Sequence, residues 1–466
     1  MLSLTRVKQY WKEDLVAGLS ISGLVIPQSM AYALLAGLPP VYGLYTSLVP
    51  VILYSLFCSS QYTITGTFAL TSLLLGKAVQ SHIGEETMIS SLMATASSNV
   101  SQEYINLAMQ ISFLAGMIQI GLGLIGVTRF TDTLLPHPLL SGFACASALH
   151  IGSSQMGNLL GLDIPHFKGY LALPRQWMHI ATHIQETHLA TAALGIGSIL
   201  LICAIRLLNK YVQRYYDVVD GGQMASVLPI ESTALLRERR VRTFRFPKIP
   251  DILVTIGSVT LLVHLFHLED LGIIITGHIP GGLPSFSAGW IFTMDFKDLF
   301  PSALVLAIVG YVITISIGKL LASRVEETIV ETRELYSLGF SSVVGAFFQS
   351  YLNTGSLTRS LIISSAGAKT PAASLWSAAV VGLVLVCLTP LFYHTPLVVL
   401  AAVILVACTG LLKEAKEVRR YWERSKVKLC LWILTFLTVV LVNVEIGLLS
   451  GMVMALVMTV YDYFFS

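Results

Sequence analysis

Long apolar segments recur along the whole sequence, separated by short polar stretches, and this recurrence constrains the fold more than any other feature. Runs of about 17–25 apolar residues have the length of helices that cross a lipid bilayer. Of the 466 residues, 55% are hydrophobic and only 12% are charged, whereas a soluble domain carries about a quarter charged residues. The chain is therefore predicted to be an all-α polytopic membrane protein.

Fourteen such segments can be placed along the chain, and the third and the tenth are too short to cross a bilayer alone. The first is expected to be interrupted at Pro27. The fourteen segments are Asp14–Ala36, Val41–Phe57, Thr67–Val79, Ile105–Val127, Pro138–Leu160, Leu189–Leu208, Asp251–Leu268, Phe300–Leu321, Leu335–Tyr351, Ser356–Ala368, Pro371–Leu391, Pro396–Leu411, Lys428–Val442 and Ile446–Phe465.

The two short segments stand seven positions apart, which is the sequence sign of an inverted-repeat transporter with seven segments in each half. In such a fold the second half enters the membrane from the opposite side. The two half-helices then point their N-termini at each other near the midplane. The two half-helices also begin with similar residues. Thr65-Gly66-Thr67-Phe68-Ala69 corresponds to Thr354-Gly355-Ser356-Leu357-Thr358, and both stretches start with Thr-Gly and a hydroxyl residue.

An arginine lies within the second of these starts, in the stretch Asn353–Ser360. An arginine at the bilayer centre costs roughly 2.5–3.5 kcal/mol on insertion scales, so such residues usually serve an ion or substrate path. Gly355 and the neighbouring hydroxyls suit a helix start, where free N–H groups receive an anion. We therefore expect an anion site at Arg359. The alternatives are that Arg359 pairs with a buried carboxylate or extends to the interface.

The distribution of basic residues predicts the orientation of the chain. With the N-terminus in the cytoplasm, twenty-four of the 29 Lys and Arg residues fall on the cytoplasmic side and four on the outer side. This bias predicts that both termini are cytoplasmic, and residues 1–13 are expected to form an interfacial lead-in. The sequon Asn99-Val100-Ser101 falls in a predicted outer loop, so Asn99 is a glycosylation candidate.

The longest polar stretch is the predicted cytoplasmic loop insertion 209–250, which ends in a basic run from Arg237 to Lys248. This loop is expected either to touch anionic lipid head groups or to be a solvated linker that follows the positive-inside rule.

Several other functions find no support in the sequence. The six cysteines are scattered and form no CxxC pair, so neither a disulfide framework nor a metal site is predicted. His179, His183, His188 and Glu186 lack an HExxH arrangement, so no metal site is expected there either. No GxSxG motif or phosphate-binding loop is present, so neither an enzyme nor a nucleic-acid partner is predicted, and no cofactor is expected.

Seven motifs are distributed along nearly the whole chain. They are Asp14-Leu15-Val16-Ala17-Gly18-Leu19, Ile26-Pro27-Gln28-Ser29-Met30-Ala31-Tyr32-Ala33, Ala36-Gly37-Leu38-Pro39-Pro40-Val41-Tyr42-Gly43-Leu44-Tyr45, Gly66-Thr67-Phe68-Ala69, Gly277-His278-Ile279-Pro280-Gly281-Gly282-Leu283-Pro284, Glu334-Leu335 and Ser356-Leu357-Thr358-Arg359-Ser360. Together they resemble the signature of the sulfate-permease (SulP) anion transporters, and most closely the animal-type anion exchangers.

The resemblance implies fourteen segments in two inverted repeats, arranged in a transmembrane domain from 14 to 466. A core domain would comprise segments 1–4 and 8–11, at about 14–127 and 300–391. A gate domain would comprise segments 5–7 and 12–14, at about 138–268 and 396–465. The core would carry the anion between segments three and ten and move against the gate as an elevator.

The resemblance also implies which residues hold the anion. Gln28 and Tyr32 on the first segment would line the pocket, although Gln28 could instead satisfy the backbone near Pro27. Two opposed helix N-termini would each offer about half a positive charge, with the arginine adding a fixed one. The residues at these starts would be Thr67, Phe68, Ala69, Leu357, Thr358 and Arg359, supported by Gly66, Gly355 and Ser356.

The sequence departs from the family pattern at two places. Members usually continue into a cytoplasmic STAS domain, and this sequence stops at Phe464-Phe465-Ser466, which leaves the usual homodimer contacts open. Proton-coupled relatives carry a glutamate where Ile313 aligns, and no acid replaces it in that segment, so proton symport is not expected.

These considerations favour a secondary transporter in the plasma membrane that exchanges chloride with bicarbonate, sulfate, oxalate, iodide or a similar anion. An anion channel or uniporter on the same scaffold stays open, as does a chloride-binding, voltage-driven motor or scaffold. A nucleobase–proton symporter of related fold would need a glutamate pair at the position of Arg359.

Overall fold

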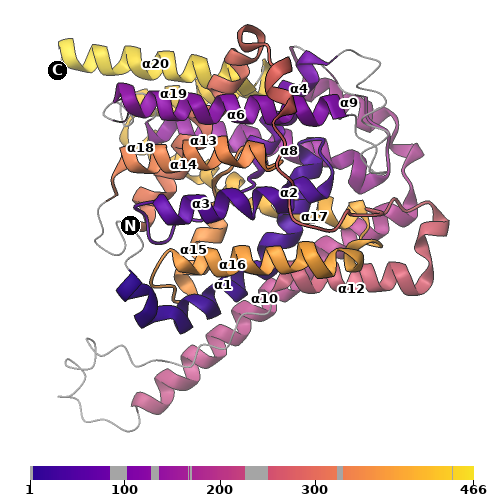
Figure 1. The fold of residues 1–466 in the computed structure, drawn as a ribbon. Coiled ribbons are helices and arrows are strands. Elements are labelled where there is room, and N and C mark those ends of the chain that lie inside the picture. The colour runs from indigo at the N-terminus through magenta and orange to yellow at the C-terminus, as the bar shows by residue number, and fades with distance from the viewer. Residues whose placement is uncertain are drawn as a thin grey trace.

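The computed structural model describes residues 4–83, 102–126, 128, 136–165, 167, 170–225, 250–322, 329–442 and 444–465, which form one bundle of helices (Figure 1). The helices are α1 (Leu4–Leu35), α2 (Pro40–Thr46), α3 (Val49–Phe57), α4 (Ala69–His82), α6 (Gln102–Ile125), α8 (His137–Leu160), α9 (Ala172–Thr182), α10 (Leu189–Ala225), α12 (Asp251–Phe266), α13 (Phe296–Ala322), α14 (Glu331–Phe347), α15 (Leu357–Ser365), α16 (Ala372–Leu383), α17 (Leu397–Leu412), α18 (Glu417–Arg424), α19 (Lys426–Leu441) and α20 (Val444–Phe465).

Each of the fourteen predicted segments is helical, although the second and the eleventh comprise more than one consecutive helix, and the predicted polytopic helical membrane fold is confirmed. Seven helical stretches in the described residues are long and apolar enough to cross a membrane by themselves. Figure 1 shows both ends of the chain on the same side of the bundle, as an even number of spans requires.

Burial separates a central part of the bundle from a lipid-facing periphery. In α1, 67% of the most apolar window is buried inside the protein, whereas in α10 the corresponding share is 33%. The exposed side chains of α10 include Ile196, Leu200 and Leu207. A large apolar surface of this kind on a membrane protein is the face that meets lipid.

Two short helices begin in the interior of the bundle, as the lengths of the third and tenth segments predict. They are α4, with 14 residues, and α15, with nine. Each is preceded by a two-residue strand, β1 (Thr65–Gly66) and β2 (Thr354–Gly355), and the strands pair antiparallel. Because the pairing is antiparallel, the two helices leave the strand pair in opposite directions.

The predicted interruption at Pro27 is wrong, because α1 continues through this residue and leaves helical dihedrals only at Tyr10. Proline removes one backbone hydrogen bond, but packed neighbours allow membrane helices to tolerate the loss. The residues around Pro27 are buried against other helices, and the hydroxyl of Ser29 donates to the carbonyl of Val25 at 2.5 Å, within the same turn.

The second segment is divided where the sequence suggested a single span. Helix α2 ends at Thr46 and α3 begins at Val49, with Pro50 in its first turn. Pro50 cannot donate a hydrogen bond to the preceding turn, so the helix restarts there.

The predicted loop insertion 209–250 is also corrected, because α10 extends to Ala225. Residues 209–217 contain neither proline nor glycine, so no helix-breaking residue stops the helix just beyond Leu208. Residues 226–249 lie outside the described residues, as does the glycosylation candidate Asn99. The short helices α9 and α18 between spans were not predicted.

Candidate functional site

Arg359 lies in the first turn of α15 and its side chain is fully buried, with 0% exposure. It is among the largest completely buried side chains in the described residues. Its guanidinium reaches back across the strand pair, because an added Cβ at Gly66 would lie 2.5 Å from its Nη1 atom. The arginine therefore lies between the starts of the two half-helices.

Two of the three guanidinium nitrogens are held by neutral oxygen atoms. Nε donates to Oε1 of Gln28 on α1 at 3.0 Å, and Nη2 donates to Oγ1 of Thr67, just before α4, at 2.9 Å. Nη1 is buried and has no hydrogen-bond partner among the described residues. An unpartnered, charged donor in the interior is rare and points to a ligand that completes the site.

Arg359 neither extends to the membrane interface nor pairs with a carboxylate of the described residues. A fully buried arginine does not extend to the interface. In the described part of the chain, none of the ion pairs includes Arg359, so a buried carboxylate does not neutralise it there. Burial of a charge without a counter-charge is costly, and an anion would relieve this cost.

The backbone around the arginine adds further positive potential. The residue before each half-helix, Phe68 for α4 and Ser356 for α15, has an extended backbone and makes no side-chain capping bond. The first N–H groups of both helices therefore lack the side-chain acceptors that commonly cap them. A cation in the first turn of a helix is itself disfavoured by the helix dipole, so three positive features converge on one place.

Gln28 and Tyr32 are brought into this arrangement from α1, as the resemblance implies. Both are buried. Nε2 of Gln28 donates to the hydroxyl of Tyr32 at 2.9 Å, while its Oε1 accepts from Arg359. Gln28 thus orients the guanidinium and the phenol together, which is more specific than satisfying the backbone near Pro27.

The other predicted site residues divide by accessibility. Thr67 and Ala69 are buried, together with Gly66, Gly355 and Ser356. Phe68 and Leu357 are half-buried and Thr358 is exposed. Phe68, Leu357 and Thr358 are therefore the members of the set that are accessible from outside the protein interior.

Sequence reasoning missed the hydroxyl groups that hold the strand pair in place. Oγ1 of Thr314 on α13 accepts the N–H of Gly355 at 2.9 Å, and Oγ of Ser360 accepts the N–H of Ile64 at 3.0 Å. An added Cβ at Gly355 would lie 2.9 Å from the Cα of Thr314. One sequence signal could have indicated Thr314. It is a hydroxyl residue directly after Ile313, the position that aligns with the glutamate of proton-coupled relatives.

Two buried carboxylates hold the chain on either side of the site. Asp14, in the first half of α1, accepts from the N–H groups of Lys369 and Thr370, after α15. Glu334 on α14 accepts from the N–H groups of Ser59 and Ser60, each at 2.7 Å, and from the Tyr54 hydroxyl. Both acids are bonded to the connections that flank the half-helices, so they position these connections.

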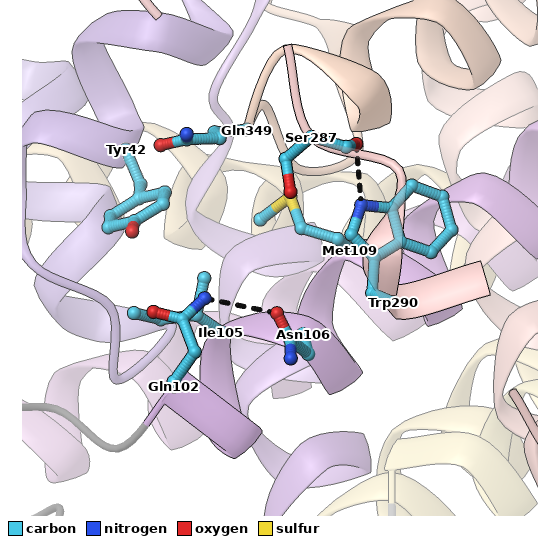
Figure 2. Close-up of a pocket in the computed structure, with 8 residues that line it drawn as sticks. All are labelled: Tyr42, Gln102, Ile105, Asn106, Met109, Ser287, Trp290 and Gln349. Carbon is cyan, nitrogen blue, oxygen red and sulfur yellow. Dashed lines mark hydrogen bonds between the residues drawn. The ribbon is translucent and has the colours of Figure 1, made fainter. Parts of the chain in front are cut away.

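A small pocket of about 80 Å³ lies elsewhere, at the end of the bundle where α6 begins. Figure 2 shows its lining, and none of the predicted anion-site residues contributes to it. Its polar groups are amides and hydroxyls, without lysine or arginine. The residues are Tyr42, Gln102, Ile105, Asn106, Met109, Ser287, Trp290 and Gln349. This pocket therefore does not have the charge of an anion site.

Replacing Gly66 by alanine is expected to weaken chloride binding at least tenfold. The new methyl group would lie 2.5 Å from Nη1 of Arg359, and Gly66 has φ +143°, which favours glycine. Chloride binding by the purified protein measures the effect. The matched control is Gly121→Ala on α6, where an added Cβ meets nothing within 4 Å. Equal affinity in both variants would contradict the placement of Nη1 at the site.

Comparison with known proteins gives a consistent result over nearly the whole chain. The model of the sulfate permease family matches residues 11–435. Prestin of Danio rerio is 31% identical over 465 residues, which cover 98% of this chain and 58% of that protein. Human solute carrier family 26 member 6 is 30% identical over 454 residues, covering 97% of this chain and 55% of that protein.

The fold also matches a solved structure. The murine anion transporter Slc26a9, in an inward-facing state, superposes with a TM-score of 0.80 at 26% identity, covering 97% of this chain and 68% of that one. The chain spans somewhat more than half the length of the two curated relatives above.

Proposed function

The chain belongs to the sulfate permease family, and on this premise we propose that it is a secondary transporter of small anions. The candidate substrates are chloride, bicarbonate, sulfate, oxalate and iodide. Membership of the sulfate permease family and the similarity to the murine anion transporter Slc26a9 support this substrate class.

The observation that carries the proposal is the state of Arg359. It is a fully buried cation whose described partners are all neutral, and one of its nitrogens has no partner. Two uncapped helix starts lie beside it. Fixed dipoles and a single arginine attract an anion without holding it too tightly for release.

Helix packing supports an elevator made of a core and a gate. Helix α6 packs against α13 and α14, and α1 packs against α16, all within the proposed core. Helix α8 packs against α17 and α19, and α19 packs against α20, all within the proposed gate. Such a division allows one group of helices to carry the site while the other stays in place.

Chloride-linked exchange is the proposed mode of coupling. The eighth segment carries Ile313 where proton-coupled relatives carry a glutamate, and Phe300–Leu321 contains no acid. The Lys and Arg distribution supports cytoplasmic termini, and the plasma membrane and a homodimer are proposed as the setting.

Uptake of labelled chloride into proteoliposomes tests this proposal, with sulfate, bicarbonate, oxalate, iodide or no permeant anion trapped inside. We expect uptake to require a trapped anion, because an exchanger returns its site only when loaded. Protein-free liposomes give the background. Equal uptake without a trapped anion at clamped voltage would instead favour a channel or uniporter. Chloride binding without uptake would favour a motor or scaffold.

A further inference from the structure

The connection between α17 and α19 contains a basic helix with two different faces. It begins with the short turn η8 (Lys413–Lys416) and continues through α18 to Ser425. The inward face of α18 carries Val418 and Tyr421, whereas Trp422 on the outside is 69% exposed.

The inward face is fixed to the bundle, which sets the orientation of the helix. The hydroxyl of Tyr421 lies 2.6 Å from Nδ1 of His137 at the start of α8. Tyr421 also packs in a small apolar cluster with Cys145, Leu429 and Trp432. The opposite face of α18 is therefore directed away from the protein.

This outward region carries a marked excess of positive charge. The stretch 413–428 contains seven basic residues and three acids. Within this stretch, which the structure describes in full, only Arg419 and Arg420 form ion pairs, with Glu423 and Glu417. The remaining cations are exposed and form no ion pair within the described residues, and they are Lys413, Lys416, Arg424, Lys426 and Lys428.

The position of α18 brings these cations to the membrane surface. The helices on either side of it are predicted to cross the bilayer, and the connection is too short to move far from their ends. Figure 1 shows α18 at the end of the bundle that also holds the chain ends. Exposed tryptophan is typical of the membrane–water interface, and Trp422 lies among the cations.

We propose that this surface, formed by η8, α18 and the first turn of α19, binds the headgroups of anionic phospholipids. The exposed cations would contact the phosphate and carboxylate groups, and Trp422 would insert between the lipids. Amphipathic helices with a basic face and an exposed aromatic residue bind anionic interfaces in this way. The positive-inside rule accounts for basic residues in any cytoplasmic loop. It does not account for their concentration on a single helix that is fixed to the bundle.

Binding of a short-chain phosphatidylserine to the detergent-solubilised chain tests the proposal, with short-chain phosphatidylcholine as the uncharged comparison. The test variant combines Arg424→Gln, Lys426→Gln and Lys428→Gln. The control variant combines Arg6→Gln, Lys8→Gln and Lys12→Gln, which removes three exposed cations from the start of α1. Loss of three cations from an anionic binding surface is expected to lower affinity about a hundredfold.

The expected result is strong weakening of phosphatidylserine binding in the α18 variant, little change in the α1 variant, and weak phosphatidylcholine binding throughout. Circular dichroism and melting curves check that both variants remain folded. Equal phosphatidylserine affinity in the two variants would overturn the proposal, as would equal binding of both lipids to the unmodified chain. A change in oligomeric state in the α18 variant with unchanged lipid binding would identify a contact between two copies and would also overturn it.

Discussion

Replacing Arg359 by alanine is expected to abolish saturable anion binding and transport while leaving the protein folded. The substitution removes a buried charge that has no counter-charge among the described residues, so the folded state loses little stabilisation. Gln28 keeps its hydrogen bond to Tyr32. The anion, in contrast, loses the one fixed charge at the site, which corresponds to about 2–5 kcal/mol for a buried charge contact.

Lysine at position 359 separates the effect of charge from that of geometry. Lysine keeps the charge but has a single ammonium group. It cannot reproduce the planar guanidinium, which contacts Gln28 through Nε and Thr67 through Nη2 and leaves Nη1 for a ligand. We therefore expect weak residual binding in Arg359→Lys. Chloride binding to the purified variants measures both effects, and Arg175→Ala on α9 is the control because that side chain is exposed. An Arg359→Ala variant with unchanged chloride affinity and flux would show that the site lies elsewhere.

The sequence predicted the half-helices because length is a local property that a bilayer constrains directly. A segment as short as Ser356–Ala368 cannot span the membrane, and the structure contains α15 there, with nine residues. The repeated Thr-Gly pair was a weak signal by sequence alone. Its two copies pair as strands, Thr65 opposite Gly355 and Gly66 opposite Thr354.

The partners of Arg359 could not be derived from local pattern. Gln28 and Thr67 are separated from it by 331 and 292 residues, so only the folded bundle, or the resemblance to a family, brings them together. The same holds for Thr314, whose contact with the N–H of Gly355 depends on how α13 packs.

The errors at Pro27 and in the loop insertion share another cause. Local rules penalise proline within a helix and associate polar stretches with loops. Packing on both sides of Pro27 overrides the first rule, and the second fails because residues 209–217 are polar but contain no helix-breaking proline or glycine.

Replacing Glu334 by alanine is expected to destabilise the protein by several kcal/mol, because each buried donor that is left without an acceptor costs about 1–3 kcal/mol. Glu334 is 2% exposed. Its Oε1 accepts from the N–H and hydroxyl of Ser59 and from the N–H of Ser60, and its Oε2 accepts from Tyr54. These donors would lose their acceptor in the interior, and the connection that leads into β1 and α4 would loosen.

The apparent melting temperature in detergent measures this effect, and chloride binding measures its consequence for the site. Glu334→Gln should be milder, because its amide oxygen can still accept from Ser59 and Ser60. The matched control is Glu331→Ala, one turn earlier on α14, whose partly exposed pair with Lys319 at 2.7 Å contributes about 1 kcal/mol or less. If Glu334→Ala melted no lower than Glu331→Ala, Glu334 would not be the residue that holds this connection.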